Sequence, residues 1–360
     1  AKFGAAGGEA HDFSRLRAYG FGPLAPTAAK NTGETFLALP PGFEYSVIGK
    51  KGGEMSDGNK TPPAHDGMAT FKVNDQIRIV RNHELTGGRV PKQGAAIGAN
   101  PYDETAAGGT TTLIINPKTR EIVRDFVSLS GTLINCAGGA TPWRSWISCE
   151  ETTLGQTVRT DSRGNKTGGF PKPHGYCFEV FASANSSLTP IPLKAMGRFV
   201  HEAVAFDKKS GIVYLTEDYN PSGFYRFLPK RNKRLAEGGT LQILKIKDKD
   251  NYDTRTKQKV GASLPVVWAA IDNPDPAEAD VDELAVFKQG KAKGAASFAR
   301  LEGCHADGRM ADFAKNIAPN MTNAEFAGST FSRDGKTLFF NLQTVGATFA
   351  VWGDWGKFRV

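Results

Sequence analysis

The sequence contains no long hydrophobic run. Its longest apolar segment, residues 264–271 (LPVVWAAI), is far shorter than the roughly 20 residues that a membrane-spanning helix needs. We therefore expect a soluble globular protein with no transmembrane segment and no membrane partner. Residue 1 is alanine and residues 1–10 are small and flexible, as they would be after removal of a leader, so an export signal would not be visible here.

Cysteine is scarce, and the signatures of several enzyme classes are missing. The four cysteines are Cys136, Cys149, Cys177 and Cys304. They include no C-x-x-C pair, which argues against a zinc ribbon, and their spacing does not define disulfides. His83 and His201 each precede a glutamate, but neither begins an H-E-x-x-H zinc-protease motif. There is also no G-x-S-x-G elbow and no G-x-x-x-x-G-K-[ST] loop, so serine hydrolase and P-loop chemistry have no support.

Acidic residues are outnumbered by basic ones, 37 to 45, for a formal net charge of +8. The basic excess lies in runs broken by turn formers, such as residues 230–234 (KRNKR), without interleaved aromatic residues or a known nucleic-acid-binding module. We expect these runs to be solvated loops, and nucleic acid not to be a specific partner. A positive field would still attract anionic substrates.

Glycine and proline are abundant, with 41 and 20 copies, and short strand-like segments lie between them. These segments of alternating or β-branched character are residues 76–80, 111–115, 143–148, 176–181, 212–216, 224–228, 241–246, 338–342 and 348–352. Many short strands at modest spacing predict an all-β sandwich, barrel or propeller. Apolar residues at helical spacing predict a minor helical insertion at residues 277–288 (AEADVDELAVFK).

A weak internal repeat favours the propeller. An apolar segment, a turn, a strand and a polar end recur in MATFKVNDQIRIVRNHE, ATPWRSWISCEE, AVAFDKKSGIVYLTED and STFSRDGKTLFFNLQ. The first three end at Glu84, Glu151 and Asp218, 67 residues apart, and the fourth ends at Gln343, 125 residues later, close to two further intervals. Because propeller blades repeat one strand order around a central channel, equivalent strand ends meet on one face. The intervals exceed the roughly 40–50 residues of ordinary blades, so longer loops or additional strands must fill the difference.

Carboxylates at converging strand ends predict a cation site. The acidic ends are Glu84, Glu150, Glu151, Glu217 and Asp218. Carboxylates in one confined mouth repel each other and raise one another's pKa unless cations neutralise them. Their oxygens suit calcium, magnesium or ferric iron, whereas a Cys136 thiolate favours a transition metal. Taken singly, a cysteine is more often buried and an acid more often solvated, so the argument depends on the recurrence.

Several motifs together resemble the PhoX family of alkaline phosphatases. They are LALPPGFEYSVIG, AHDGMATF, IVRNHE, GTLINCAGGATPWRSWISCEE, GRFVHEAVAFD, IVYLTED, FYRFLP, ARLEG and FSRDGKTLFFNLQTVGATFAVWGDW. The resemblance divides the chain into an N-terminal extension, residues 1–36, and a single propeller domain, residues 37–360. It implies a six-bladed β-propeller with two ferric ions and calcium at its central mouth. It also implies hydrolysis of small phosphate monoesters and export by the twin-arginine (Tat) route to the periplasm or beyond, and we expect a monomer.

The resemblance assigns roles to individual residues. The implied metal ligands are Cys136, Glu151, Glu202, Asp218, Glu302 and Glu325. Arg300, in ARLEG, matches an arginine that grips phosphate and would be the catalytic residue, although Leu301 replaces the family's proline. A guanidinium suits this role because its planar fork binds two phosphate oxygens.

Two other functions stay open. The first is a propeller hydrolase of another ester, either a phosphodiester or a lactone. The chain looks shorter than long family members between Glu302 and Ser332, and Arg144 and Ser145 stand where those members have Gly-Thr, so the metals could be kept and the ester changed. The second is a non-catalytic propeller whose ions serve structure alone. The thiolate argues against the second, because sulfur is a poor calcium ligand.

Overall fold

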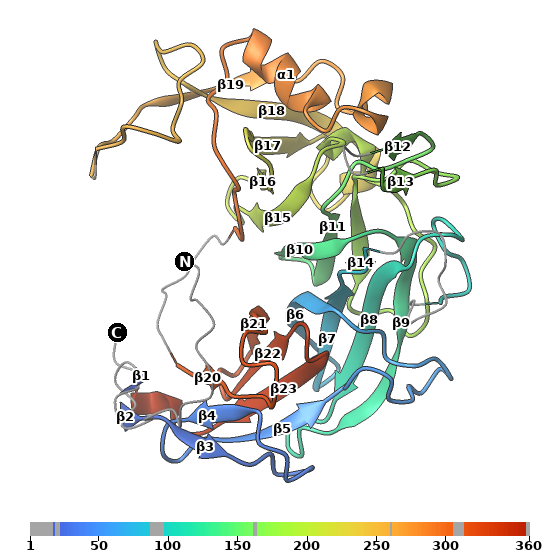
Figure 1. The fold of residues 1–360 in the computed structure, drawn as a ribbon, viewed down its shortest axis with the longest axis vertical. Coiled ribbons are helices and arrows are strands. Elements are labelled where there is room, and N and C mark those ends of the chain that lie inside the picture. Colours follow the sequence, from blue (N-terminus) through green and yellow to red (C-terminus); the bar gives the residue numbers. More distant parts are fainter. Residues whose placement is uncertain are drawn as a thin grey trace.

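The computed structural model describes residues 17–18, 22–86, 97–160, 164–259, 261–304 and 313–357, and this part of the chain consists mainly of short antiparallel strands. Four sheets of three to five strands stand around a common centre, like blades of a propeller (Figure 1). The prediction of an all-β, propeller-like fold with minor helical insertions is confirmed at this level.

The four radial sheets are described from the centre outward. The first contains β6 (His65–Val73), β7 (Gln76–His83), β8 (Gly108–Ile115) and β9 (Ile122–Thr132). The second contains β10 (Asn135–Ala140), β11 (Ser145–Glu150) and β14 (Cys177–Phe181). The third contains β15 (His201–Phe206), β16 (Val213–Glu217), β17 (Phe224–Pro229), β18 (Gly239–Ile246) and β19 (Val266–Ala270). The fourth contains β21 (Phe326–Phe331), β22 (Thr337–Leu342), β23 (Ala347–Trp352) and β5 (Glu44–Ile48). All the predicted strand segments lie in these sheets, with boundaries shifted by a few residues.

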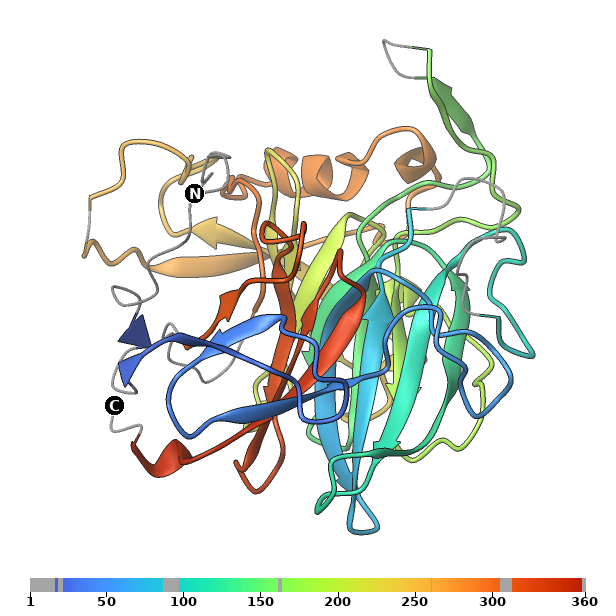
Figure 2. The same cartoon turned by 60° about the horizontal axis from the view of Figure 1, so that its bottom comes forward.

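Smaller elements complete the described chain. The remaining strands are β1 (Arg17–Ala18), β2 (Gly22–Pro23), β3 (Ala25–Thr27), β4 (Leu37–Leu39), β12 (Val158–Thr160), β13 (Lys166–Gly168) and β20 (Lys315–Asn316). The 3-10 helices are η2 (Lys194–Met196), η3 (Leu235–Glu237), η4 (Ala277–Asp280) and η5 (Trp355–Lys357), and the α-helix is α1 (Ala285–Ala292). In Figure 2 the strands of the first sheet run roughly vertically, and α1 and the β12–β13 hairpin lie near the top of the view.

The predicted helical insertion at residues 277–288 is interrupted. It divides into η4 and α1, because Asp280 at the end of η4 is tied to other segments by an ion pair with Arg198 and a hydrogen bond from the main-chain N–H of Thr157. These contacts outweigh the helical preference of the segment. None of the described helices has the length and apolar character needed to cross a bilayer.

Apolar side chains fill the space between neighbouring sheets. One buried cluster includes Phe71, Val80, Trp146 and Phe178. A second includes Ile147, Leu215 and Phe227. A third includes Ile48, Ile79 and Phe339. Each cluster joins side chains of two adjacent sheets, so inner strands are covered on both faces. The segment GGTTTLII of β8 is accordingly buried at every position. This packing holds the innermost strands together: β6 lies against β21 and β10, and β10 lies against β15.

The internal repeat corresponds to the first hairpin of each radial sheet: β6–β7, β10–β11, β15–β16 and β21–β22. Each innermost strand has a register irregularity near its start, between the residue pairs 65/68, 135/138, 201/204 and 327/330. A bulge of this kind bends the strand and redirects a side chain. The residues inside the first three irregularities include Asp66, Cys136 and Glu202, and the fourth contains Gly328 instead.

Candidate metal centre

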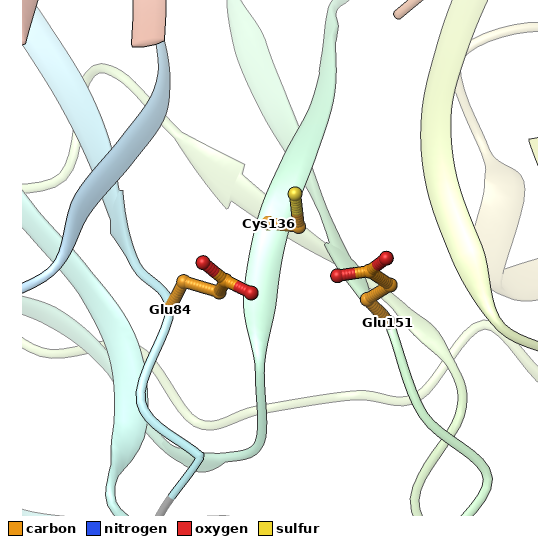
Figure 3. A group of neighbouring side chains, drawn as sticks. All are labelled: Glu84, Cys136 and Glu151. Atoms are coloured by element: carbon orange, nitrogen blue, oxygen red, sulfur yellow. The ribbon is translucent and has the colours of Figure 1, made fainter. Parts of the chain in front are cut away.

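Five side chains from three sheets meet at the centre of the fold. The donor atoms of Glu84, Cys136 and Glu151 lie within 4.8 Å of one another, and so do those of Glu151, Glu202 and Asp218. Glu151 belongs to both groups, so the two form one continuous cluster. Figure 3 shows Glu84 and Glu151 pointing toward each other from either side of the strand that carries Cys136.

The backbone holds the acidic strand ends in equivalent positions. The N–H of Glu84 donates to the carbonyl of Ala64, that of Glu151 to Ile134, and that of Asp218 to Val200, at 2.9, 2.8 and 3.1 Å. In each of these three sheets, the main-chain N–H of the residue after the second strand therefore donates a hydrogen bond to the carbonyl of the residue before the first strand. This is the convergence that the repeat predicted.

Because side chains alternate in direction along each strand, adjacent acidic residues point either into the central mouth or into the protein interior. Glu150 precedes Glu151 but points inward, where it accepts N–H groups from Leu133, Gly175 and Tyr176 at 2.8 to 3.0 Å. Glu217 precedes Asp218 and accepts from Gly223 N and Tyr225 Oη at 2.7 and 2.9 Å. Successive side chains of a strand point to opposite faces. Two of the five predicted acidic ends are thus structural anchors that do not face the mouth.

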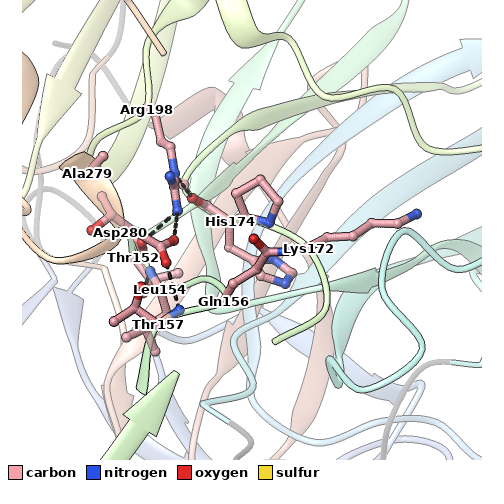
Figure 4. Close-up of polar contacts among 12 residues, drawn as sticks. Thr152, Leu154, Gln156, Thr157, Lys172, His174, Arg198, Ala279 and Asp280 are labelled. Carbon is pink, nitrogen blue, oxygen red and sulfur yellow. Dashed lines mark hydrogen bonds and ion pairs between the residues drawn. The ribbon is translucent and has the colours of Figure 1, made fainter. Parts of the chain in front are cut away.

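The loop after Glu151 is secured by a buried network (Figure 4). His174 Nδ1 lies 2.6 Å from Oε1 of Glu150, and both side chains are fully buried. Arg198 donates from Nε to the carbonyl of His174 at 2.8 Å, and its Nη2 lies 2.6 Å from Oδ1 of Asp280. These bonds connect η4 to the segment between β11 and β14. Glu151 therefore emerges from backbone that is fixed on its interior side.

Burial and mutual repulsion raise the pKa values of the mouth acids. Burial, and then the charge of Glu84, raises the pKa of Asp66 to about 7. Burial, followed by the charges of Glu302 and Asp66, raises the pKa of Glu202 to about 8. The pKa of Glu151 is raised by burial and by its contact with Asp218, and burial raises the pKa of the Cys136 thiol. Cations would displace these protons and balance the charge.

The metal-free protein should become less stable as pH rises from about 5 to 9. Its mouth carboxyl groups have folded-state pKa values above the 4.5 and 3.8 of ordinary Glu and Asp, so the folded protein binds more protons than the unfolded chain in this range. Stability then falls with increasing pH. Thermal unfolding of chelator-treated protein at several pH values checks this, with metal-loaded protein as the control. A melting temperature that is constant or rising across the range would contradict it.

The remaining predicted ligands lie at the rim. Glu302 and Glu325 are both exposed, and among the described residues neither belongs to a group with donor atoms within ligand distance. Partial burial, and then the charge of Asp218, raises the pKa of Glu302, while Glu325 acts on the pKa values of Asp66 and Glu84. The structure thus brings Cys136, Glu151, Glu202 and Asp218 together and leaves Glu302 and Glu325 around them.

Arg300 reaches the mouth from the segment after the third sheet. Its Nε lies 2.8 Å from Oδ1 of Asp218, and its side chain is 66% exposed against 3% for the aspartate. That oxygen has no hydrogen bond of good geometry, so the contact is an ion pair. The N–H of Arg300 donates to the carbonyl of Tyr219, which anchors the backbone. The side chain of Arg300 is largely exposed, which leaves the guanidinium room to turn toward an anion.

Sequence reasoning missed two acidic residues of the mouth. Asp66 Oδ1 lies 4.0 Å from Sγ of Cys136, and Glu84, recognised as an acidic strand end, was not assigned as a ligand although it lies in the cluster. The internal repeat could have identified Asp66, if the first strand of each repeated hairpin is compared instead of the end of the second strand. There the bulge of AHDGMATF places Asp66 at the position that Cys136 and Glu202 occupy in their own sheets.

The donor set fits the cations that the family resemblance implies. Donor atoms within 4.8 Å of one another match ligands arranged around an ion at about 2.0 to 2.6 Å. The first group contains a thiolate donor and suits iron, whereas the second contains only carboxylates and suits calcium. Among the described residues, Arg300 forms an ion pair with one of these carboxylates, that of Asp218, which leaves most of their charge unbalanced.

Comparison with known proteins gives a family but no similar curated protein. The model of the family described as Alkaline phosphatase PhoX matches residues 19–125 and 116–316. No curated protein matches the chain. The solved structures it resembles include the holo PQQ domain of pyranose dehydrogenase from Coprinopsis cinerea, 9% identical, with 91% of this chain and 100% of that chain covered and a TM-score of 0.39. They also include a family AA12 carbohydrate-active enzyme from Trichoderma reesei, 11% identical, with 89% and 98% covered and a TM-score of 0.31.

The sequence identities and TM-scores to these structures are low. The family match, by contrast, extends over most of the chain and includes Cys136, Glu151, Glu202, Asp218 and Arg300. The chain belongs to the PhoX family of alkaline phosphatases.

Proposed function

We propose that this protein is a metal-dependent phosphatase that hydrolyses small phosphate monoesters at the central mouth of its propeller. The family is one of phosphoric monoester hydrolases. The observation that carries the proposal is the cluster in which a thiol and four carboxylates from three sheets surround one space. A solvent-accessible arginine stands beside it.

The types of donor atom indicate which residues would hold each cation. Cys136, with Glu84 and Glu151, would hold iron, since a thiolate is a soft ligand that calcium does not favour. Glu151, Glu202 and Asp218 would hold calcium. Glu302 and Glu325 would join from the rim, because their exposed side chains are free to change rotamer. Bound cations would polarise the phosphate oxygens and lower the pKa of a bound water.

The protein itself supplies position and charge. The guanidinium of Arg300 would bind two phosphate oxygens through parallel charge-assisted hydrogen bonds. Asp218, 4% exposed, is held by its main-chain bond to Val200, and its contact with Arg300 would keep the fork near the mouth until substrate arrives. The net charge of +8 would favour the approach of an anionic ester.

We also infer export to the periplasm or the exterior through the Tat route and a ring of six blades, both supported by family membership, and we expect a monomeric state. The described residues contain four radial sheets, so six blades and the domain division at residue 37 stay predictions. The size of a native particle in solution tests the monomer.

Hydrolysis of chromogenic esters tests the substrate class. Metal-loaded protein should hydrolyse p-nitrophenyl phosphate faster than bis(p-nitrophenyl) phosphate or an aromatic lactone. A preference for the diester or the lactone would identify another propeller hydrolase. Binding of cations without hydrolysis of any of the three would identify a structural role for the ions.

Prolonged chelation should abolish hydrolysis and lower the melting temperature together. Ions that neutralise several buried carboxylates bind the folded state and stabilise it by mass action. Elemental analysis before and after chelation, combined with thermal unfolding, checks this, and adding iron and calcium back should restore both properties. An unchanged melting temperature after verified metal removal would show that the cluster does not hold the ions.

A further inference from the structure

The fourth radial sheet presents a neutral amide where the other three present carboxylates. The N–H of Gln343, which follows β22, donates to the carbonyl of Glu325, just before β21, at 3.2 Å. Glu84, Glu151 and Asp218 make the corresponding bond in their own sheets. Gln343 therefore enters the mouth from the same backbone position as these three acids but carries no charge.

The side chain of Gln343 bridges two carboxylates. Its Nε2 lies 2.5 Å from Oδ2 of Asp66 and 2.5 Å from Oε2 of Glu84. Because an amide nitrogen carries two hydrogens, it can donate one to each acid. The N–H of Gly346 donates to the carbonyl of Gln343 at 2.9 Å, so a turn fixes the backbone from which the amide projects.

The bridge occupies one oxygen of each acid and leaves the other without a contact to Gln343. Oδ1 of Asp66 faces Sγ of Cys136 at 4.0 Å, and Asp66 is 5% exposed. Its main-chain carbonyl also accepts a bond from Nδ2 of Asn341 at 2.6 Å. Glu84 meanwhile lies within ligand distance of Cys136 and Glu151. One amide thus sets the rotation of two carboxylates at once.

We propose that Gln343 is a positioning residue of the metal centre, which binds one oxygen of Asp66 and one of Glu84 and directs their other oxygens toward the cation beside Cys136. The inference rests on the proposed function, because it assigns a cation to these carboxylates. An apolar side chain at this position would leave the two acids free to turn away. A glutamate would lose both donors and add a third negative charge.

Cation affinity tests the role of Gln343 without depending on catalysis. Calcium alone is titrated into metal-free protein in competition with a chelator of known affinity, and iron content is measured on protein purified without chelator. Groups that orient metal ligands typically contribute 10- to 100-fold to metal affinity. Gln343→Met should therefore weaken affinity, or deplete iron, by about 10- to 100-fold. Gln343→Asn, whose amide is one carbon shorter, should show a loss in the same direction.

The matched control is Gln289→Met, which removes an amide that donates to the carbonyl of Asn273 at 2.8 Å, away from the mouth. It should bind cations as the wild type does. Cation affinity and iron content within twofold of wild type in both Gln343 variants would overturn the inference. So would equal losses of melting temperature with and without metal at unchanged affinity, which would mark a purely structural role.

Failure of the two proposals is distinguishable. A wild-type protein that binds neither calcium nor iron would overturn the proposed function and this inference together. A wild type that binds them, with Gln343 variants that hold them equally tightly, would overturn the positioning role alone.

Discussion

Replacing Arg300 by alanine should lower kcat/KM for a phosphate monoester by about 100- to 1000-fold, the usual cost of losing one preorganised donor to developing charge. The exposed guanidinium lies beside the carboxylate cluster, in an ion pair with Asp218. Because it would contact the transferring oxygens, inhibition by inorganic phosphate should weaken in parallel. Steady-state kinetics with and without phosphate measure both effects.

Arg300→Lys separates charge from geometry at this position. Lysine keeps the positive charge but cannot form two parallel bonds to phosphate, so most of the loss should persist. Metal content should survive in both variants, since Arg300 donates no ligand. Near-native hydrolysis and phosphate inhibition in Arg300→Ala, with metals still bound, would remove Arg300 from the substrate pocket.

Cys136→Ser should lose iron and most phosphatase activity while keeping calcium. A serine hydroxyl is a much weaker iron ligand than a thiolate, and the all-carboxylate group does not include Cys136. Removing a ligand should cost more than the 10- to 100-fold typical of the groups that merely orient ligands. Elemental analysis measures the metals, and loss of the visible absorption expected of a ferric thiolate gives a second readout.

Cys149→Ser is the matched control for this substitution. Cys149 is fully buried in β11 and faces Cys177, with 3.6 Å between their sulfur atoms, and both are free thiols. The side chain lies outside both donor groups, so the variant should retain its iron whatever stability it loses. Equal iron loss from the two variants would contradict the assignment of Cys136.

The inner hairpins could be predicted from the sequence because a hairpin is a local structure with a local signal. The ends Glu84, Glu151 and Asp218 lie at a constant interval, and equal spacing of equivalent strands implies convergence. The bulges are different. They depend on pairing between strands, and no composition marks Asp66 as the residue that a bulge redirects. Comparing the first strands of the repeat, rather than their ends, would have identified it.

The orientation of neighbouring acids was harder to predict. Glu150 and Glu151 are adjacent and chemically identical, yet one accepts backbone N–H groups in the interior and the other faces the mouth. Strand register decides between them, and register is set by packing with other sheets. Likewise, the interruption between η4 and α1 follows from an ion pair between Asp280 and Arg198, 82 residues apart. Contacts of this range leave no periodic pattern in the sequence.

The pairing of the chain's early and late strands in the fourth sheet predicts that this sheet forms late during folding. Its outer strand β5 pairs with β23, so Glu44 lies opposite Trp352 and accepts a hydrogen bond from its indole across 308 residues of sequence. During synthesis β5 emerges long before its partner, and such distant pairing is slow because the intervening chain must first be brought together. The other three radial sheets are built from continuous stretches of chain. The side of the mouth that carries Gln343 is therefore expected to be completed last, and the centre to acquire its final shape only when both ends of the domain have met.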